Sequence, residues 1–309
     1  MIRRLRFSLL GHPVRHSLSP VICGAAFSAL DLPHVYTAID VPSEAGLARV
    51  FDDLRAGVLA GCNVTVPYKR AVFELADERA PSAEAVGAAN VIVRSPEGRL
   101  TAHNTDADAL AQDLTPLLEG RPRQRAAILG AGGAAFAALT ACKKLGFALT
   151  CMTTRSWPSS ELVHEAESAA RARAMGALTM PWPKPDDVAP TGKLSQAMRM
   201  QWSELAAGAD CVIQATSAGM EGSDPGEDVS GVVPWARLGD HAVAYDVVYT
   251  PRETPFLRAA AARGIAASDG LGMLVRQAGL AITLWTGLSA PLDHMRQAAE
   301  ARLPPPRER

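Results

Sequence analysis

The chain has 309 residues, of which 48% are hydrophobic and 20% are charged, and its net charge at pH 7 is −1. This length predicts two domains of roughly 150 residues each, and the composition is typical of a globular protein that buries a core. A net charge so close to zero provides no basic field for a polyanion, so nucleic acid is not expected as a partner.

The cysteines and the apolar runs indicate a compartment. An odd number of cysteines without a CxxC pair favours reduced thiols over a disulfide framework or a zinc site. We therefore expect a cytoplasmic protein without a bound metal. No apolar stretch is long enough to cross a bilayer, and the apolar run in MIRRLRFSLLGHP is too short for a signal peptide, so no membrane partner is expected. The cysteines are Cys23, Cys62, Cys142, Cys151 and Cys211.

Strand-like and helix-like segments alternate along the chain, which predicts an α/β protein with parallel sheets. In the first third, helices are expected over 20–30, with Ser19 as the N-cap, and over 105–118. The run 88–94 is expected to pair with the segment around Leu100. Three apolar or β-branched runs predict strands here: FSLLG (7–11), CNVTVP (62–67) and AANVIVR (88–94).

A second α/β unit begins near Arg125. A helix is expected over 134–145, with Gly146 at its C-terminal end, and an apolar, buried helix over 271–285. The stretch 174–197 is rich in Pro, Met and Lys and predicts a long surface loop. Four short runs predict strands: RAAILG (125–130), ALTCM (148–152), DCVIQAT (210–216) and HAVAYDVVY (241–249).

The sequence GAGGAA from Gly130 to Ala135 matches the pattern G-x-G-x-x-A between a predicted strand and a predicted helix. Gly130 permits a tight turn, Gly132 lets backbone N–H groups approach a pyrophosphate, and Ala135 allows close packing of helix on strand. This context predicts a dinucleotide site. The alternative is an ordinary turn between a strand and a helix.

The residues after the second strand of this unit indicate which dinucleotide binds. NAD-binding chains carry Asp or Glu there, to accept hydrogen bonds from the ribose hydroxyls. Here Thr154 and Arg155 provide no carboxylate to repel a 2′-phosphate and add a guanidinium that can pair with one. NADP is therefore favoured over NAD, and the alternative is a solvated surface arginine.

Lys69 and Asp106 are candidates for proton chemistry. Reducing a carbonyl needs a proton donor beside the oxygen that becomes an alkoxide, and an ammonium supplies both the proton and charge stabilisation. Asp106 lies at a predicted helix start, where the dipole favours its anion. Lys69 also lies at a predicted helix start, which favours its deprotonation. A surface lysine and a helix-capping aspartate are the alternatives.

Two serines precede the first predicted helix. Ser17 and Ser19 place two hydroxyls at a helix N-terminus, which can bind a carboxylate, although Ser19 can also simply cap the helix. Further polar residues lie at predicted strand ends, where α/β proteins bind ligands and where local turns also need partners. These are Asn63, Thr65, Asn90 and Asn104.

The chain resembles the shikimate dehydrogenase family (shikimate/quinate dehydrogenases) from about Phe7 to Trp285. Nine motifs occur in the family's order: GHPVRHSLSP, CNVTVPYK, GAANV, HNTDA, GAGGAA, TTRS, ATSAGM, YDVVYTPRETPF and DGLGMLVRQA. This family reduces 3-dehydroshikimate to shikimate with NADPH in aromatic amino-acid biosynthesis. The resemblance implies a substrate domain at 1–106 plus 270–309, a Rossmann-type NADP domain at 107–269, and an active site in the cleft between them.

The resemblance also implies roles for individual residues. Lys69 and Asp106 are the implied catalytic pair, and Ser17 and Ser19 the implied ligands of the substrate carboxylate. The remaining implied substrate ligands are Asn63, Thr65, Asn90, Tyr249 and Gln277. The implied cofactor ligands are Gly130, Ala131, Gly132, Gly133 and Ala134 at the pyrophosphate, Thr154, Arg155 and Ser156 at the 2′-phosphate, and Met220, Gly270 and Met273 near the nicotinamide. Met273 and Gln277 are i and i+4 on one predicted helix and so share a face.

This chain departs from the family pattern at several positions. Cys23 and Gly24 stand where the family has a His and an amide residue, and AANV replaces the family's usual AVNT, so that a threonine is lost. The family's 2′-phosphate clamp has a second arginine, and its position falls near Ser159 in the run WPSS, which contains no arginine.

Three alternatives to shikimate reduction follow from the sequence. A quinate/shikimate dehydrogenase using NAD or NADP is the first, although quinate-preferring relatives tend to carry threonine at the position of Ser19. An aminoshikimate enzyme is the second. A non-catalytic, nucleotide-binding regulatory protein is the third, and the presence of both Lys69 and Asp106 argues against it. A monomer or homodimer is expected.

Overall fold

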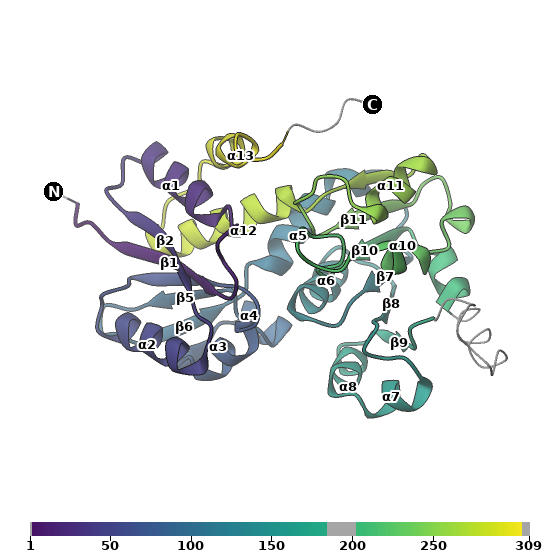
Figure 1. Cartoon of the computed structure of the whole chain (residues 1–309), viewed down its shortest axis with the longest axis horizontal. Coiled ribbons are helices and arrows are strands. Elements are labelled where there is room, and N and C mark those ends of the chain that lie inside the picture. Colours follow the sequence, from purple (N-terminus) through teal and green to yellow (C-terminus); the bar gives the residue numbers. More distant parts are fainter. Residues whose placement is uncertain (1, 184–201, 305–309) are drawn as a thin grey trace. The chain divides into compact units, whose positions relative to one another are not determined.

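The computed structural model describes residues 2–183 and 202–304, and the chain divides into two compact units. Unit 1 comprises Met1–Ala109 and Gly272–Arg309, and unit 2 comprises Leu110–Leu271. Each unit contains a six-stranded sheet covered by helices, as Figure 1 shows. Among the described residues, no helix combines the length and apolarity needed to cross a membrane.

The sheet of unit 1 is mixed, with the strand order β2-β1-β3-β5-β6-β4. β1 is parallel to β2 and β3, whereas β5 is antiparallel to β3 and β6. The predicted pairing of 88–94 with the segment around Leu100 is confirmed. The expectation of parallel strands holds in this unit for β1 with β2 and β3 and for β4 with β6, but not for β5. A tight turn with Gly98 at φ +90° reverses the chain between β5 and β6. The strands are β1 (Arg6–Gly11), β2 (Val35–Asp40), β3 (Gly61–Val64), β4 (Glu78–Arg79), β5 (Val91–Arg94) and β6 (Leu100–His103).

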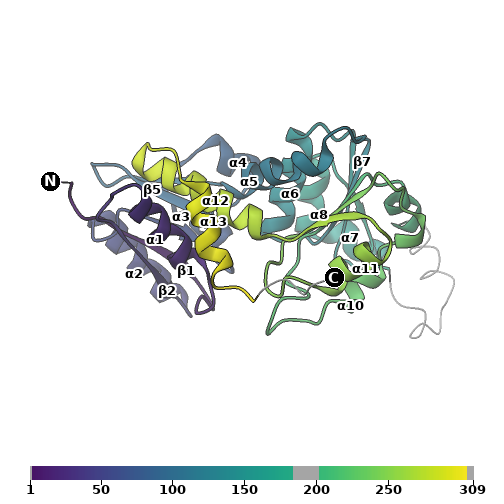
Figure 2. The same cartoon turned by 90° about the horizontal axis from the view of Figure 1, so that it is seen from above.

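Helices cover both faces of this sheet (Figures 1 and 2). On one face, the ring of Phe7 in β1 stacks on Trp285 of α12 with centroids 4.7 Å apart, and it also packs on Phe27 of α1. These aromatic contacts pack α12, from the C-terminal part of the chain, and α1 against the first strand. The helices of this unit are α1 (Ser19–Ala29), α2 (Glu44–Arg55), α3 (Lys69–Leu75), α4 (Pro81–Val86), α12 (Leu271–Thr286) and α13 (Leu292–Glu300), and α5 (Asp106–Leu114) begins in unit 1 and ends in unit 2.

α2 covers the opposite face and was not among the predicted elements. Its buried residues recur with helical spacing at Leu47, Val50, Phe51 and Leu54, which makes one face of the helix apolar. Ser43 caps the helix by accepting a hydrogen bond from the backbone N–H of Gly46 at 3.4 Å. These apolar side chains pack in one core with residues of the sheet.

The sheet of unit 2 is entirely parallel, with the order β12-β11-β10-β7-β8-β9. Numbered from the first strand of the unit, this is the order 3-2-1-4-5-6 of a Rossmann fold, with its switch point between β7 and β10. The Rossmann-type prediction is confirmed. The strands are β7 (Arg125–Leu129), β8 (Leu149–Thr153), β9 (Leu178–Met180), β10 (Cys211–Gln214), β11 (Val243–Asp246) and β12 (Ala266–Ser268).

Two predicted segments that lie partly or wholly in unit 2 need correction. The helix predicted over 105–118 ends at Leu114, and Pro116–Leu118 forms a separate 3-10 turn, because proline cannot donate to the helical ladder. The predicted loop over 174–197 contains β9, which pairs with β8, and its residues 184–197 lie outside the described residues. The helices are α6 (Gly133–Lys144), α7 (Ser160–Glu165), α8 (Glu167–Ala174), α10 (Glu227–Gly231) and α11 (Pro255–Ala262), with a 3-10 turn at Trp235–Arg237.

Candidate active site

The mixed sheet of unit 1 brings polar residues from three strands to one edge. Asn63 lies near the carboxyl end of β3, and Asn90 directly precedes β5, which runs antiparallel to β3. Because β6 reverses direction again, the residues that follow it, including Asp106, emerge at the same edge. Topology therefore explains why these residues, spread over more than forty positions, meet in space.

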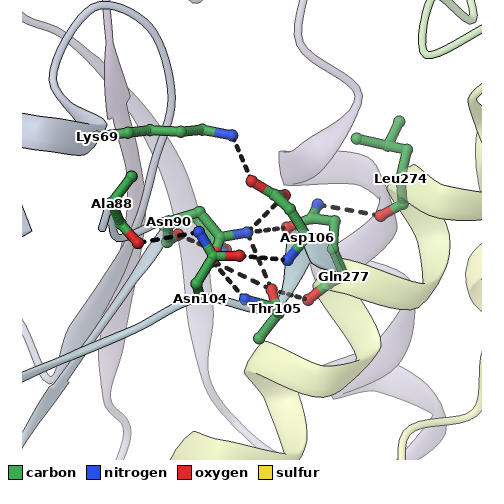
Figure 3. A network of polar contacts seen from close by, with 9 residues as sticks. Lys69, Ala88, Asn90, Asn104, Thr105, Asp106, Leu274 and Gln277 are labelled. Carbon is green, nitrogen blue, oxygen red and sulfur yellow. Dashed lines mark hydrogen bonds and ion pairs between the residues drawn. The ribbon is translucent and has the colours of Figure 1, made fainter. Parts of the chain in front are cut away.

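Lys69 and Asp106 form an ion pair within unit 1. Each is the first residue of its helix, α3 and α5 respectively. The ammonium Nζ lies 2.6 Å from Asp106 Oδ2, and the two side chains are 19% and 6% exposed. Figure 3 shows the lysine reaching over to the carboxylate. The predicted pairing of this amine with this carboxylate is thus present in the structure.

The other contacts of Asp106 hold its carboxylate in one orientation. Asn90 Nδ2 donates to Asp106 Oδ1 at 2.7 Å, so each carboxylate oxygen has a donor. The backbone N–H of Asp106 donates to Asn104 Oδ1 at 3.0 Å, and Asn104 Nδ2 donates in turn to the carbonyl of Ala88 at 3.0 Å. A buried charge is tolerated when it is paired and fully hydrogen-bonded in this way.

Asn90 is the centre of the network and is 2% exposed. Besides Asp106, its Nδ2 donates to Thr105 Oγ1 at 2.9 Å and to Gln277 Oε1 at 3.4 Å, and its Oδ1 accepts from the backbone N–H of Thr105 at 2.8 Å. Gln277 of α12 is joined a second time, because Thr105 Oγ1 donates to its carbonyl at 3.1 Å. Figure 3 shows these contacts converging on Asn90. Thr105 was not predicted as a site residue, although it lies in the HNTD motif.

Asn63 makes two side-chain hydrogen bonds near this network. Its Oδ1 accepts from the hydroxyl of Tyr36 at 2.7 Å, and its Nδ2 donates to the carbonyl of Asn90 at 3.3 Å. Tyr36 comes from β2, and its role was not predicted. Thr65 follows β3 and is partly exposed, with its backbone N–H bonded to the carbonyl of Leu10.

Ser19 was predicted to be the N-cap of the first helix, and the structure differs from this prediction. α1 begins at Ser19 itself, Leu18 occupies the N-cap position, and no side chain caps the helix from there. Pro20 follows as the second residue of the helix, where its fixed φ and its missing N–H are tolerated. Ser17 Oγ instead accepts from the Ser19 N–H and donates to Ser19 Oγ, both at 3.2 Å. The two hydroxyls therefore lie side by side at the start of α1.

The glycine-rich turn of unit 2 joins β7 to α6 at the switch point of the sheet. Gly130 has φ +128°, and a Cβ there would lie 2.9 Å from the carbonyl of Ala215, so only glycine fits without strain. Gly132 is the N-cap of α6, and a Cβ there would meet nothing within 4 Å. Ala135 is fully buried, as close helix packing requires. Open space beside a helix N-terminus is suited to a pyrophosphate.

Arg155 follows β8, as predicted, and lies in an ion pair with Asp224. Arg155 NH1 is 2.5 Å from Asp224 Oδ2, and both side chains are partly exposed. The hydrogen bond from Arg155 holds the pKa of Asp224 below its ordinary value. Ser156 Oγ donates to Thr154 Oγ1 at 3.5 Å. Asp224 was not predicted, and its sequence position 69 residues away carries no signal of the contact.

The loops after β10, β11 and β12 contain the remaining predicted residues of unit 2, which are Met220, Tyr249 and Gly270 respectively. The N–H of Gly270 donates to the carbonyl of Val248 at 3.1 Å, and a Cβ on Gly270 would lie 2.1 Å from the carbonyl of Val247. Tyr249 is partly exposed and Met220 is 44% exposed. Met273 lies on α12 in unit 1, one helical turn before Gln277.

Asp246 is a buried carboxyl of unit 2 that was not predicted. It accepts from Thr254 Oγ1 at 2.6 Å and from the N–H of Val248 at 2.9 Å. Burial raises its pKa to about 7, against the opposing effect of these two hydrogen bonds, and Asp269 adds to the increase. The carboxyl therefore braces the loop that carries Tyr249.

A Rossmann unit with a glycine-rich turn, together with a lysine–aspartate pair in a separate α/β unit, defines a dinucleotide-dependent oxidoreductase. Residues 9–92 match the shikimate dehydrogenase substrate binding domain, and residues 270–300 match the shikimate 5′-dehydrogenase C-terminal domain. The shikimate dehydrogenase (NADP(+)) of Symbiobacterium thermophilum is 39% identical over 298 residues, which cover 96% of this chain and 93% of that protein. The chain belongs to the shikimate dehydrogenase family.

Solved structures agree with this assignment. The shikimate 5-dehydrogenase of Thermus thermophilus, in complex with NADP(H) and shikimate, is 33% identical with a TM-score of 0.75 and covers 97% of this chain and 100% of that one. The quinate dehydrogenase of Corynebacterium glutamicum, in complex with NAD, is 26% identical with a TM-score of 0.77 and the same coverage. The family thus includes structures with either dinucleotide.

Proposed function

We propose that the protein catalyses the reversible reduction of 3-dehydroshikimate to shikimate with NADPH, in the aromatic amino-acid (chorismate) pathway. The observation that carries this proposal is the Lys69–Asp106 pair, in which an ammonium is held by an oriented, buried carboxylate at 2.6 Å. The family relationship supports the substrate and the cofactor. The corresponding domains are 1–106 with 270–309 for substrate and 107–269 for NADP.

Lys69 and Asp106 perform the proton transfer in this proposal. NADPH, when bound, supplies the hydride to the carbonyl carbon. As negative charge develops on the carbonyl oxygen, Lys69 Nζ stabilises it and donates a proton. Asp106 keeps the ammonium in position and balances its charge. In the reverse direction the neutral amine accepts the proton from the substrate hydroxyl.

The substrate contacts remain predictions that local geometry supports. The adjacent hydroxyls of Ser17 and Ser19 at the start of α1 suit a carboxylate. Asn63, Thr65 and Gln277 are assigned to the hydroxyl groups of the ring, and Tyr249 to the substrate from unit 2. Asn90 is assigned an additional positioning role, because its amide already holds Asp106 and Thr105.

The cofactor contacts are likewise proposed. The turn at Gly130 and Gly132 fits a pyrophosphate, because it combines open space with the N-terminus of the twelve-residue helix α6. Ala131, Gly133 and Ala134 complete that turn. Thr154, Arg155 and Ser156 are assigned to the 2′-phosphate, and Met220, Gly270 and Met273 to the nicotinamide end.

The cellular setting is part of the proposal. All five cysteines are free and buried in the structure, which supports a cytoplasmic location. Monomer or homodimer stays a prediction. So does the placement of the active site in a cleft between the domains.

A kinetic matrix tests the proposed activity. Shikimate and quinate are each assayed with NADP and NAD, by following the absorbance of the reduced nicotinamide. The highest kcat/KM is expected for shikimate with NADP. A larger kcat/KM for quinate would instead favour the quinate alternative, which the similarity to the quinate dehydrogenase keeps relevant. A lack of turnover with every pair, despite nucleotide binding, would favour the non-catalytic regulatory protein.

A further inference from the structure

The loop between β10 and α10 presents a carboxylate to the arginine that we assign to the 2′-phosphate. Arg155 NH1 lies 2.5 Å from Asp224 Oδ2, and the side chains are 40% and 38% exposed. Both residues belong to unit 2. Partial exposure leaves the guanidinium open to an incoming anion, while one of its N–H donors is already engaged.

Asp224 is held in place by its own loop as well as by Arg155. Its Oδ1 accepts from the N–H of Gly226 at 3.0 Å, and its backbone carbonyl accepts from the N–H of Gly219 at 2.6 Å. Gly226 has φ +94°, and a Cβ there would lie 2.9 Å from the nitrogen of Gly219, so the loop is tightly folded. The carboxylate therefore stays near its position when the guanidinium moves to another partner.

The same loop begins beside the glycine-rich turn. The N–H of Ala215 donates to the carbonyl of Leu129 at 2.9 Å. The carbonyl of Ala215 lies 2.9 Å from the place that a Cβ on Gly130 would occupy. A dinucleotide whose pyrophosphate contacts this turn thus approaches the loop that carries Asp224.

A carboxylate and a phosphate on one guanidinium repel each other. The 2′-phosphate carries up to two negative charges near neutral pH, and a like charge within a few ångströms in partly exposed surroundings weakens its binding. The adenosine ribose of NAD has a neutral hydroxyl at this position and does not meet this repulsion. Asp224 therefore acts on one dinucleotide and not on the other.

We infer that Asp224 is a specificity-determining residue: it competes with the 2′-phosphate of NADP for Arg155 and so limits the preference of the protein for NADP over NAD. This inference rests on the proposed role of Arg155. Cofactor choice then depends in part on a loop residue that lies outside both the glycine-rich turn and the TTRS motif.

Asp224→Asn tests the inference with little change in structure. The asparagine Oδ1 still accepts from the N–H of Gly226, whereas the negative charge is lost. The expected result is a Kd for NADP+ about three- to fivefold lower, the range for an exposed ion pair, with the Kd for NAD+ changed less than about twofold. Calorimetry with 2′,5′-ADP (adenosine 2′,5′-bisphosphate) and with 5′-AMP, on the full chain, isolates the contribution of the 2′-phosphate.

A matched control removes the same charge elsewhere in unit 2. Glu204 is an exposed carboxylate that pairs with Arg237 at 2.9 Å. Glu204→Gln changes the net charge by the same amount and is expected to leave the affinity for both dinucleotides unchanged. A gain in NADP+ affinity with this control would mean that overall charge, and not Asp224, determines the effect, and would overturn the inference.

Arg155→Ala and the double variant distinguish a failure of the inference about Asp224 from a failure of the proposed role of Arg155. If Arg155→Ala weakens NADP+ more than NAD+ but Asp224→Asn brings no gain, or brings a loss, the carboxylate does not compete and only the inference fails. If Arg155→Ala weakens both dinucleotides equally, the arginine does not bind the 2′-phosphate and both fail. In the double variant the gain from Asp224→Asn is expected to be smaller than in the unaltered chain, because only the direct repulsion of the phosphate, and not the competition for Arg155, is then relieved.

Discussion

Two ion pairs of similar length serve the two units in different ways. Lys69 and Asp106 in unit 1 are largely buried, whereas Arg155 and Asp224 in unit 2 are each more than a third exposed. Breaking a buried pair leaves an uncompensated charge and typically costs about 3–5 kcal/mol, whereas an exposed pair contributes about 0–1 kcal/mol. The first pair is thus a fixed arrangement suited to proton transfer. The second can give up one partner for a ligand.

The largest expected effect comes from removing the ammonium of the buried pair. Lys69→Ala is expected to lower kcat for shikimate oxidation by about 10²–10⁴-fold, with a smaller change in KM, because the general acid–base group is lost. Steady-state kinetics at saturating NADP+ measures the effect. An unchanged kcat would show that Lys69 takes no part in the chemistry.

The neighbouring residue on α3 provides the control for this variant. Arg70 pairs with Glu74 on the exposed side of the helix at 3.2 Å. Arg70→Ala is expected to keep kcat within about twofold, since exposed pairs of this kind contribute little. Thermal unfolding of both variants checks that the loss in Lys69→Ala is chemical and does not arise from a weakened helix.

Another buried carboxyl extends the comparison, because Asp246 has hydroxyl and amide donors where Asp106 has an ammonium. Its pKa of about 7 in the folded chain lies above the value of an exposed aspartate. Between about pH 4 and pH 7 the folded state therefore holds a proton that the unfolded chain has lost. Its contribution to stability is greatest at low pH and decreases as the pH rises towards 7, by at most about 1.4 kcal/mol per pH unit.

Asp246→Asn is expected to remove this part of the pH dependence, since asparagine cannot ionise. The free energy of unfolding in urea, measured at pH 5 and pH 8, should decrease more over this interval for the unaltered chain than for the variant. Equal decreases would mean that Asp246 titrates as an ordinary exposed carboxyl. Tryptophan fluorescence follows unit 2, where Trp157 and Trp202 are fully buried.

The features predictable from sequence were those that depend on near neighbours. The turn at Gly130 and the helix starts at Lys69 and Asp106 follow from local chemistry, and the structure has them where the sequence indicated. The contacts that orient these residues were not predictable in the same way. Thr105 bonds to a residue 172 positions away and Arg155 to one 69 positions away. Such partners are selected by strand order and helix packing, which a single sequence does not display.

A substitution at Asn90 tests whether the geometry of the Lys69–Asp106 pair depends on the hydrogen bonds around it. Asn90→Ala removes the donor to Asp106 Oδ1 and the acceptor for the N–H of Thr105. Leaving buried polar groups unsatisfied is expected to lower the free energy of unfolding by about 1–3 kcal/mol. Because Asp106 loses its orientation, kcat should decrease more than KM rises, and the pH profile of kcat should shift. A rise in KM alone would limit Asn90 to substrate binding.

Removing Arg155 from the exposed pair is expected to have the smallest effect. It also tests most directly whether this pair exchanges one partner for a ligand. Arg155→Ala is expected to raise KM for NADP+ by about tenfold, the scale of a charge-assisted hydrogen bond at a partly exposed site, with KM for NAD+ changed less than twofold. Arg237→Ala, at the exposed Arg237–Glu204 pair of unit 2, is the control and should change neither value. If Arg155→Ala instead lowered kcat with both dinucleotides, as a change at Lys69 should, this pair would belong to the fixed machinery. The contrast between the fixed pair Lys69–Asp106 and the exchangeable pair Arg155–Asp224 would then be wrong.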